Sequence, residues 1–294
     1  MASKWAKVIV GFDARDESHD ALRLGRELAD AEGADLHVAV VHPRGKLPFE
    51  EALVREPISD QLDETLYQEV AHQLEGAPFT PARLHGGLSG RSAARALYEY
   101  AESEAADLIA VGSSHRGKIG RVLPGSVGES LLRGAPCAVA VAPRGFARGE
   151  HAGFGLIGVG YDGSPESRHA LAEAEGLARL LDCSLRVISV VPELAALPVQ
   201  AYSLGEIHES MRKGYRDVLE AGVATIGKGI AVEPVLIDGD PAAALADQGV
   251  ELDLLVVGSR GYGPVRGALA GAVSAAVIRA APCPVLVTPR ASES

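Results

Sequence analysis

Short runs of aliphatic and β-branched residues alternate with longer amphipathic stretches along the chain. The first half holds five such runs, which we predict to be strands: VIVGF, LHVAVV, PARLHG, DLIAVGS and AVAVAP. They lack strict polar alternation, as expected of parallel strands buried on both faces. One intervening stretch carries an apolar stripe of helical period, formed by Ala21, Leu22, Leu24, Leu28 and Ala31. In the second half, Ser164 followed by Pro165 is typical of a helix start. The alternation predicts an α/β fold with helices on the faces of a parallel sheet.

The whole pattern occurs twice. KVIVGFDARDESHDAL in the first half matches IGVGYDGSPESRHAL in the second, so that Asp13 aligns with Asp162, and DLIAVGS later matches DLLVVGS. The second copy is a few residues shorter, visibly so before its fourth strand. Residues 143–155 are rich in Gly, Pro and charge, which indicates a linker. We therefore predict two tandem domains, 1–145 and 153–294, each with five strands and four helices.

A glycine-rich loop follows the fourth predicted strand of each copy, in residues 112–132 and 258–278. Glycines there let backbone N–H groups approach a phosphate, and the helix that follows adds unpaired N–H groups and a positive dipole end. The alternative is that the glycines serve only a tight turn and close packing. A Walker-type match at Gly112–Lys118 fails, because Ile119 stands where Ser or Thr must bind magnesium. Basic side chains add positive charge to both loops: Arg116, Lys118, Arg121, Arg260 and Arg266.

Net charge and cysteine content narrow the classes of partner. A formal charge of −11 and a pI near 5.3 argue against nucleic acid and anionic membranes as partners. The three cysteines show no metal or dithiol spacing, and the N-terminal apolar stretch is too short for a signal peptide. No apolar run approaches membrane-spanning length. We therefore expect a cytoplasmic protein.

These motifs together resemble the tandem type of the universal stress protein family. The resemblance rests on a first strand that ends in Asp, a second that ends near V-V-x-P, DLIxVGS, the long glycine loop and APCxVxV, all in the same order. It covers nearly all of both copies. The resemblance implies a Rossmann-like, doubly wound fold of the adenine nucleotide α-hydrolase-like type. It also implies ATP as the ligand, with or without Mg²⁺.

ATP-binding members of the family carry Gly, two residues, Gly, nine residues, then Gly followed by Ser or Thr. The first copy keeps the hydroxyl but has His115 in place of the second glycine, while the second copy keeps the glycines and has Ala272 in place of the hydroxyl. Ser274 is positioned to compensate in part. The resemblance also implies that an aspartate lies by the ribose and adenine and that a valine lies against adenine. The implied nucleotide-binding residues are Asp13, Val41, Gly112, Ser114, His115, Gly117, Lys118, Gly125, Ser126 and Val127, and then Asp162, Val190, Gly258, Arg260, Gly261, Gly271, Ala272 and Val273.

Each of these assignments has a structural alternative. An aspartate after the first strand can simply cap the following turn, and the two valines can be ordinary core residues. The paired Cys137 and Cys283 are better read as small buried thiols than as redox partners.

The leading hypothesis is an ATP-binding protein of stress response or signalling, in which nucleotide occupancy changes conformation or partner affinity. The sequence predicts no catalytic constellation, so at most weak ATP hydrolysis is expected. Two other hypotheses remain open: a nucleotide-free dimerisation scaffold with degenerate sites, and a slow ATPase. The copies are expected to form a pseudo-dimer within the chain through their last strands, and two chains could form a homodimer. If one site alone is occupied, the first copy is favoured, because Lys118, Arg121 and Ser126 can engage phosphate.

Overall fold

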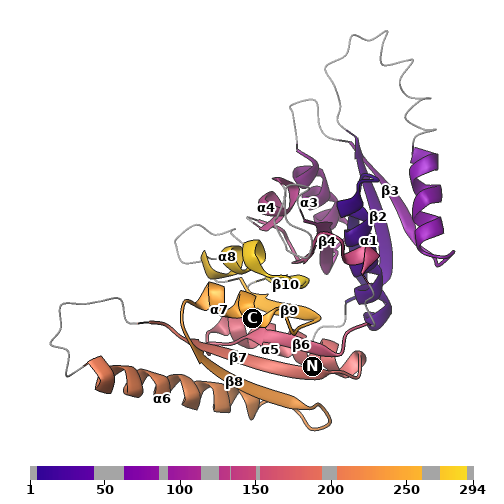
Figure 1. Ribbon diagram of the computed structural model, residues 1–294. Coiled ribbons are helices and arrows are strands. Elements are labelled where there is room, and N and C mark those ends of the chain that lie inside the picture. The colour runs from indigo at the N-terminus through magenta and orange to yellow at the C-terminus, as the bar shows by residue number, and fades with distance from the viewer. Residues whose placement is uncertain are drawn as a thin grey trace. The chain divides into compact units, whose positions relative to one another are not determined.

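Each half of the chain folds into a parallel sheet flanked by helices (Figure 1). The computed structural model describes residues 5–42, 63–85, 92–113, 126–132, 134–149, 153–193, 204–259 and 272–289. The chain divides into two compact units. We call Lys4–Glu150 the first domain and His151–Ser294 the second domain, and describe each by itself.

The first domain has the strand order β3-β2-β1-β4-β5, with every described pairing parallel. The order runs outward from β1 in both directions, which makes the carboxyl ends of β1 and β4 the switch point where open α/β sheets bind ligands. Residues 63–73 are also helical. The elements are β1 (Lys7–Phe12), α1 (Asp16–Glu32), β2 (Asp35–His42), β3 (Thr80–His85), α3 (Ala93–Ser103), β4 (Leu108–Gly112), α4 (Ser126–Leu132), β5 (Ala138–Ala142) and the short 3-10 helix η1 (Phe146–Arg148).

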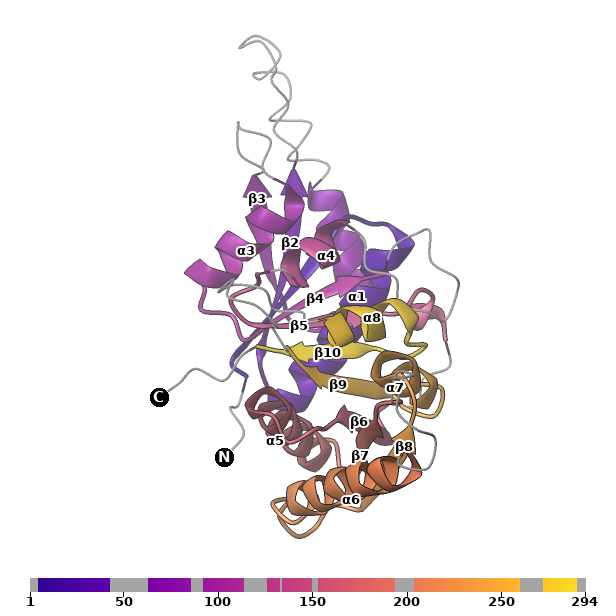
Figure 2. The same ribbon diagram turned by 90° about the vertical axis from the view of Figure 1, so that its left-hand side faces the viewer.

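The second domain repeats this arrangement as β10-β9-β6-β7-β8, again parallel. Its longest helix, α6, lies along β7 and β8 (Figure 2). The elements are β6 (Leu156–Gly160), α5 (Pro165–Leu180), β7 (Ser184–Val191), α6 (Leu204–Val223), β8 (Val232–Asp238), α7 (Pro241–Gln248), β9 (Leu254–Gly258), α8 (Ala272–Ala280) and β10 (Val285–Thr288). The prediction of five strands and four helices is confirmed for the described residues of each domain, and α7, with 8 residues against 11 in α3, lies in the stretch predicted to be shorter.

Helices cover both faces of the first sheet. A Cβ on Gly11 would meet Leu97 of α3, whereas a Cβ on Gly25 of α1 would meet Val10. Since successive strand residues point to opposite faces, α1 and α3 lie on opposite sides of β1. The strands are accordingly buried on both faces: no residue of β5 or β10 is even half-exposed. Burial on both faces therefore explains why these strands lack polar alternation in the sequence, as predicted.

Local signals at helix and strand ends work as predicted. The Ser164 side chain caps α5 by accepting a hydrogen bond from the N–H of Ser167 at 3.2 Å, and Pro165 is the first helical residue. Four of the five predicted stripe residues of α1 are fully buried, whereas Ala31 is half-buried and the neighbouring Ala29 takes its place in the core. The buried face of α1 thus follows the predicted helical period except at its last position.

The sequence motif that opens the fourth strand has a structural role at the opposite edge of each sheet. Asp107 accepts hydrogen bonds from the N–H groups of Ala6 and Lys7, at 2.7 and 3.0 Å. Asp253 does the same for Gly155 and Leu156, at 2.8 and 2.9 Å. These aspartates therefore fasten the start of each first strand, far from the carboxyl ends.

The first part of the predicted linker is folded onto α1. The buried Asp20 carboxylate accepts hydrogen bonds from the N–H groups of Gly145 and Ala147, at 2.8 and 2.7 Å. Arg23 donates to the carbonyls of Ala147 and Gly149 and lies over the ring of Phe146. The chain after β5 is consequently anchored to the first domain through these contacts.

Candidate functional site

One pocket lies at the carboxyl edge of the sheet in each domain, where the strand order reverses. The first pocket has a volume of about 290 Å³ and the second about 220 Å³. The first is lined by Gly11, Phe12, Asp13, Arg15, Glu17, Ser18, Ala39, Val41, Ala93, Leu97, Val111, Gly112, Ser113, Val127 and Gly128. The second is lined by Gly160, Tyr161, Asp162, Ser164, Glu166, Ser167, Ile188, Val190, Pro192, Tyr215, Pro241, Leu245, Val257, Gly258, Val273 and Ser274.

Three helices begin at each pocket. The first residues of α5, α7 and α8 contribute Glu166, Pro241, Val273 and Ser274 to the lining of the second pocket. The starts of α1, α3 and α4 hold the matching positions in the first. The positive ends of the helix dipoles therefore lie around each cavity and favour an anionic group there. Some of the helix-start N–H groups are already capped, by Ser164 in α5 and by Asp240 in α7.

The two aspartates line their pockets and also cap turns. Asp162 Oδ1 accepts a hydrogen bond from the N–H of Ser164 at 3.0 Å, and Asp13 Oδ1 accepts one from the N–H of Arg15 at 3.2 Å. In the first domain, Asp13 Oδ2 also lies 3.6 Å from Arg15 Nη1. Each aspartate thus caps the turn after the first strand, as the structural alternative predicted. The same hydrogen bond holds the carboxylate at the rim of its pocket.

The glycines that end the fourth strands are required by packing. A Cβ on Gly112 would lie 1.8 Å from the carbonyl oxygen of Glu17, and one on Gly258 would lie 2.6 Å from that of Glu166. Real Cβ atoms do not approach backbone this closely, so both positions need glycine whether or not a ligand is bound. The close approach also brings the first turn of α1 or α5 against the carboxyl end of the strand, at the edge of the cavity.

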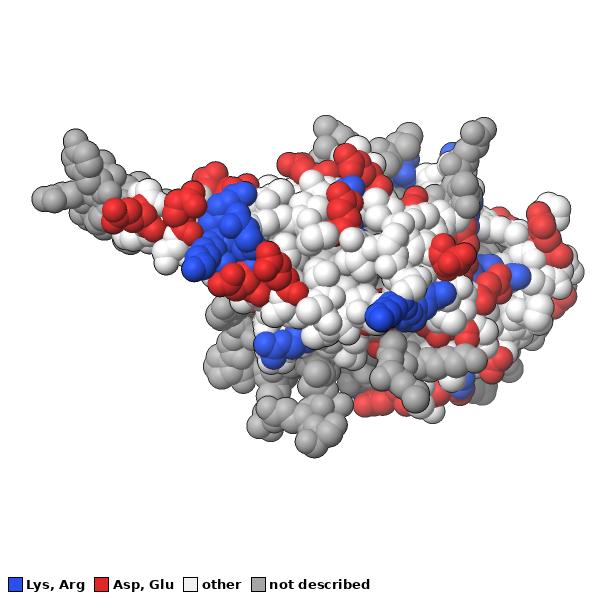
Figure 3. Space-filling view, turned by 90° about the horizontal axis from the view of Figure 1, so that it is seen from below, with Lys and Arg blue, Asp and Glu red and all other residues white. Residues whose placement is uncertain are grey.

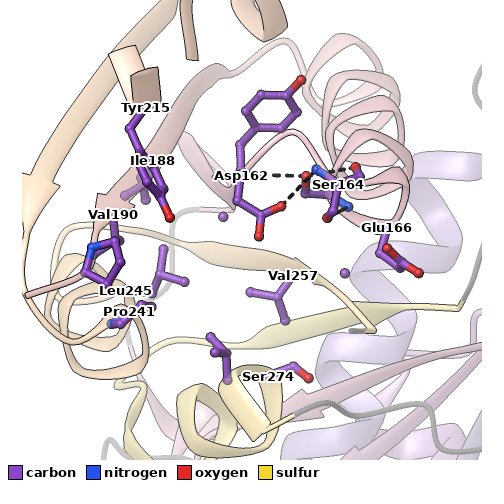
Figure 4. A pocket seen from close by; sticks show the side chains of 16 residues that line it. Asp162, Ser164, Glu166, Ile188, Val190, Tyr215, Pro241, Leu245, Val257 and Ser274 are labelled. Carbon is purple, nitrogen blue, oxygen red and sulfur yellow. Dashed lines mark hydrogen bonds between the residues drawn. The ribbon is translucent and has the colours of Figure 1, made fainter. Parts of the chain in front are cut away.

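The second pocket has an apolar side and a polar side (Figure 4). Ile188, Val190 and Tyr215 lie together on one side, and Asp162 and Ser164 lie across from them. Leu245 and Pro241 extend the apolar side from α7. A molecule with a flat apolar end and a polar or charged end suits this division.

Of the predicted nucleotide-binding residues, the structure brings Asp13, Val41, Gly112 and Val127 into the first pocket, and Asp162, Val190, Gly258 and Val273 into the second. Ser126 and Ala272 are the first residues of α4 and α8. The other predicted residues lie outside the described ranges: Ser114, His115, Gly117, Lys118, Gly125, Arg260, Gly261 and Gly271.

Several lining residues escaped the sequence interpretation. Ala39 and Ile188 stand two positions before the predicted valines, and the period of a strand could have placed them on the same face. Leu245 and Tyr215 carried no local signal, because each comes from a helix remote in sequence from the predicted motifs.

The helix that supplies Tyr215 also carries three basic residues within five positions. Arg212, Lys213 and Arg216 lie close together in the sequence of α6. On the face seen in Figure 3, basic side chains stand beside acidic ones. Arg212 pairs with Asp238, which also lies 3.1 Å from His208 Nε2. The charges at this surface are therefore mixed in sign.

The cysteines are poor candidates for chemistry. Burial raises the pKa of Cys137 and of Cys283 to about 12, and that of the half-buried Cys183 to about 11. Thiols with such values are not nucleophilic near neutral pH. Within the described ranges, no three His, Cys, Asp or Glu side chains gather in a way that could hold a metal ion. No helix in those ranges is long and apolar enough to cross a membrane.

The fold defines a tandem, doubly wound α/β protein with a pocket at the carboxyl edge of the sheet in each domain. The sequence model of the universal stress protein family matches residues 4–143 and again residues 153–289. The chain belongs to this family.

Individual relatives agree. A universal stress protein of Mycolicibacterium smegmatis is 29% identical over 296 residues, covering 95% of this chain and 96% of that protein. One of Mycobacterium tuberculosis is 32% identical over 185 residues, so that the match spans 63% of this chain and 62% of the relative. The crystal structure of a universal stress protein from Archaeoglobus fulgidus has a TM-score of 0.67 at 22% identity and covers 97% of this chain and 98% of its own. This last likeness shows the fold.

Proposed function

We propose that each domain binds an adenine nucleotide in its pocket, with ATP as the principal ligand, and that occupancy regulates a stress response by changing conformation or partner affinity. The observation that carries the proposal is the recurrence of one pocket in both domains, with an apolar wall on one side and three helix N-termini around it. An apolar wall suits a purine, and helix N-termini suit phosphate.

The lining residues divide naturally between the parts of such a ligand. The purine packs on the apolar side, against Val190 in the second pocket and Val41 in the first. The carboxylates of Asp162 and Asp13 stand at the rim, where they can accept hydrogen bonds from ribose hydroxyls. The phosphates then lie over the helix starts.

Nucleotide binding at these positions can be transmitted by the protein. The ligand would contact the starts of three helices and the ends of three strands at once, so it would stabilise any conformation that draws these elements together. The size of such a shift is limited by the difference in affinity between the two conformations. Occupancy, and not turnover, is the signal in this proposal.

The test uses a matched pair of pocket-filling variants. Gly11 and Gly160 lie on the pocket floors, where a Cβ would sit 3.0 and 3.1 Å from the flexible ends of Leu97 and Leu245. Gly11→Val and Gly160→Val therefore place a side chain into one cavity each. Gly214→Val is the control, because a Cβ there meets nothing within 4 Å on α6.

Isothermal titration with ATP and ADP is expected to give two sites in the wild type and in the control. Each pocket-filling variant should retain one site, and the double variant none. Circular dichroism and a cooperative melt establish that every variant is folded. An absence of binding heat at millimolar nucleotide in the wild type refutes the proposal and favours the nucleotide-free scaffold.

A further inference from the structure

The floors of the two pockets differ in the size of one buried side chain. Strand register pairs Gly11 with Ala39 in the first domain and Gly160 with Ile188 in the second. Ala39 and Ile188 are thus structurally equivalent. Both are fully buried and line their pockets. Where the first pocket has a methyl group, the second has a branched four-carbon side chain.

A second difference comes from the helix that precedes the third strand of each sheet. In the second domain, Tyr215 of α6 reaches the pocket and lies near Ile188 and Val190 (Figure 4). Among the described residues of the first domain, none from the helical segment 63–73 lines the pocket. In the second pocket, Ile188 therefore adds carbon atoms to the floor, and the ring of Tyr215 closes one side of the cavity.

The cavity volumes agree with these substitutions. The second pocket measures about 220 Å³ and the first about 290 Å³. Both floors otherwise carry a glycine beneath a leucine, Leu97 in the first domain and Leu245 in the second. Ile188 and Tyr215 both lie on the apolar side of the second pocket, across from Asp162 (Figure 4).

We propose that Ile188 and Tyr215 determine the specificity of the second pocket, which accepts an unsubstituted adenine and rejects one enlarged at its N6 edge, whereas the first pocket accepts both. The inference rests on the proposed function. The N6 edge of adenine is opposite the bond to ribose, so a nucleotide with its phosphates over the helix starts presents that edge to the apolar wall. Closely packed walls relax only partly, and one additional methylene in such a pocket changes binding about 10–200-fold.

The experiment compares ATP with N6-benzyl-ATP at each pocket in isolation. The Gly11→Val background leaves the second pocket open, and the Gly160→Val background leaves the first. We expect the analogue to bind at least ~10-fold more weakly than ATP at the second pocket and within ~3-fold of ATP at the first.

Exchanging the floor residues Ala39 and Ile188 between the pockets should exchange their tolerance of the benzyl group. In the Gly11→Val background, Ile188→Ala should restore analogue binding by at least ~10-fold while ATP affinity changes far less. In the Gly160→Val background, Ala39→Ile should weaken the analogue by a similar factor. Tyr215→Ala tests the ring wall and should give a smaller gain, and Tyr215→Phe, which keeps the ring, should give none.

The outcomes separate this inference from the proposed function. The specificity assignment is overturned if both pockets bind ATP and bind N6-benzyl-ATP equally well. It is also overturned if the exchange of Ala39 and Ile188 leaves the preference for ATP over the analogue unchanged. Either outcome leaves the proposed function standing. A second pocket that binds neither ATP nor the analogue overturns both for that domain. Circular dichroism must show each variant folded at the temperature of its titration, because truncation of the buried Ile188 lowers the unfolding midpoint by itself.

Discussion

Replacing Asp20 with alanine should loosen the first domain measurably. The carboxylate is only 2% exposed and accepts hydrogen bonds from the N–H groups of Gly145 and Ala147. Alanine leaves both donors without this acceptor. A backbone N–H that loses its partner away from water costs roughly 1–3 kcal/mol, and these two are partly buried. We therefore expect the free energy of unfolding of the first domain to fall by about 2–3 kcal/mol.

The single tryptophan makes this measurement specific to one domain. Trp5 belongs to the first domain, lies two residues before β1 and is 3% exposed, so its fluorescence reports the loss of this buried environment at the start of β1. Urea denaturation followed by this fluorescence gives the free energy of unfolding, and a parallel melt should show a midpoint lower by roughly 4–12 °C. Circular dichroism of the second domain's transition should be unchanged.

Asp16→Asn provides the matched control. Asp16 also lies on α1 and pairs with Arg148 of the same segment at 2.6 Å, but both side chains are more than half exposed. Exposed ion pairs contribute about 0–1 kcal/mol, so the control should be close to wild type. If Asp20→Ala destabilises the domain no more than Asp16→Asn does, the anchoring of the segment after β5 by a buried acceptor is wrong.

Three further predictions follow from single sites. Burial raises the pKa of Asp20 above its ordinary value of 3.8, so the folded state favours the neutral acid. The contribution of Asp20 to stability, measured against Asp20→Asn, should be greatest below that value and decline as pH rises through the folded pKa; a rise with pH would contradict this. Ala14 has a φ of 58°, where its second-domain counterpart is glycine, so Ala14→Gly should raise the free energy of unfolding by about 0.5–1 kcal/mol in the same assay. Cys137 and Cys283 should react with a thiol reagent only after denaturation, and rapid labelling of the native protein at pH 8 would show that the last strands open readily.

The sequence alone determined the local and periodic features. The repeat, the strands buried on both faces, the cap at Ser164 and the carboxylates after the first strands all follow from residues close together in the chain. Hydrogen bonds of helix starts and the two-residue period of strands depend on neighbours within a few positions, so the pattern records them directly. This is why the fold was predicted, together with four of the residues that line each pocket.

Tertiary structure decided what closes each pocket and what anchors the segment after β5. Tyr215 reaches the second cavity because α6 packs along β7 and β8, and Leu245 because α7 lies over Gly160. Asp20 meets Gly145 across more than a hundred residues of chain. Such contacts depend on how helices pack on the sheet and on the lengths of the connections between them, which no short window of sequence encodes. The sequence alone therefore shows that the domain is duplicated, whereas the difference between the pockets of the two domains depends on how the helices pack on each sheet.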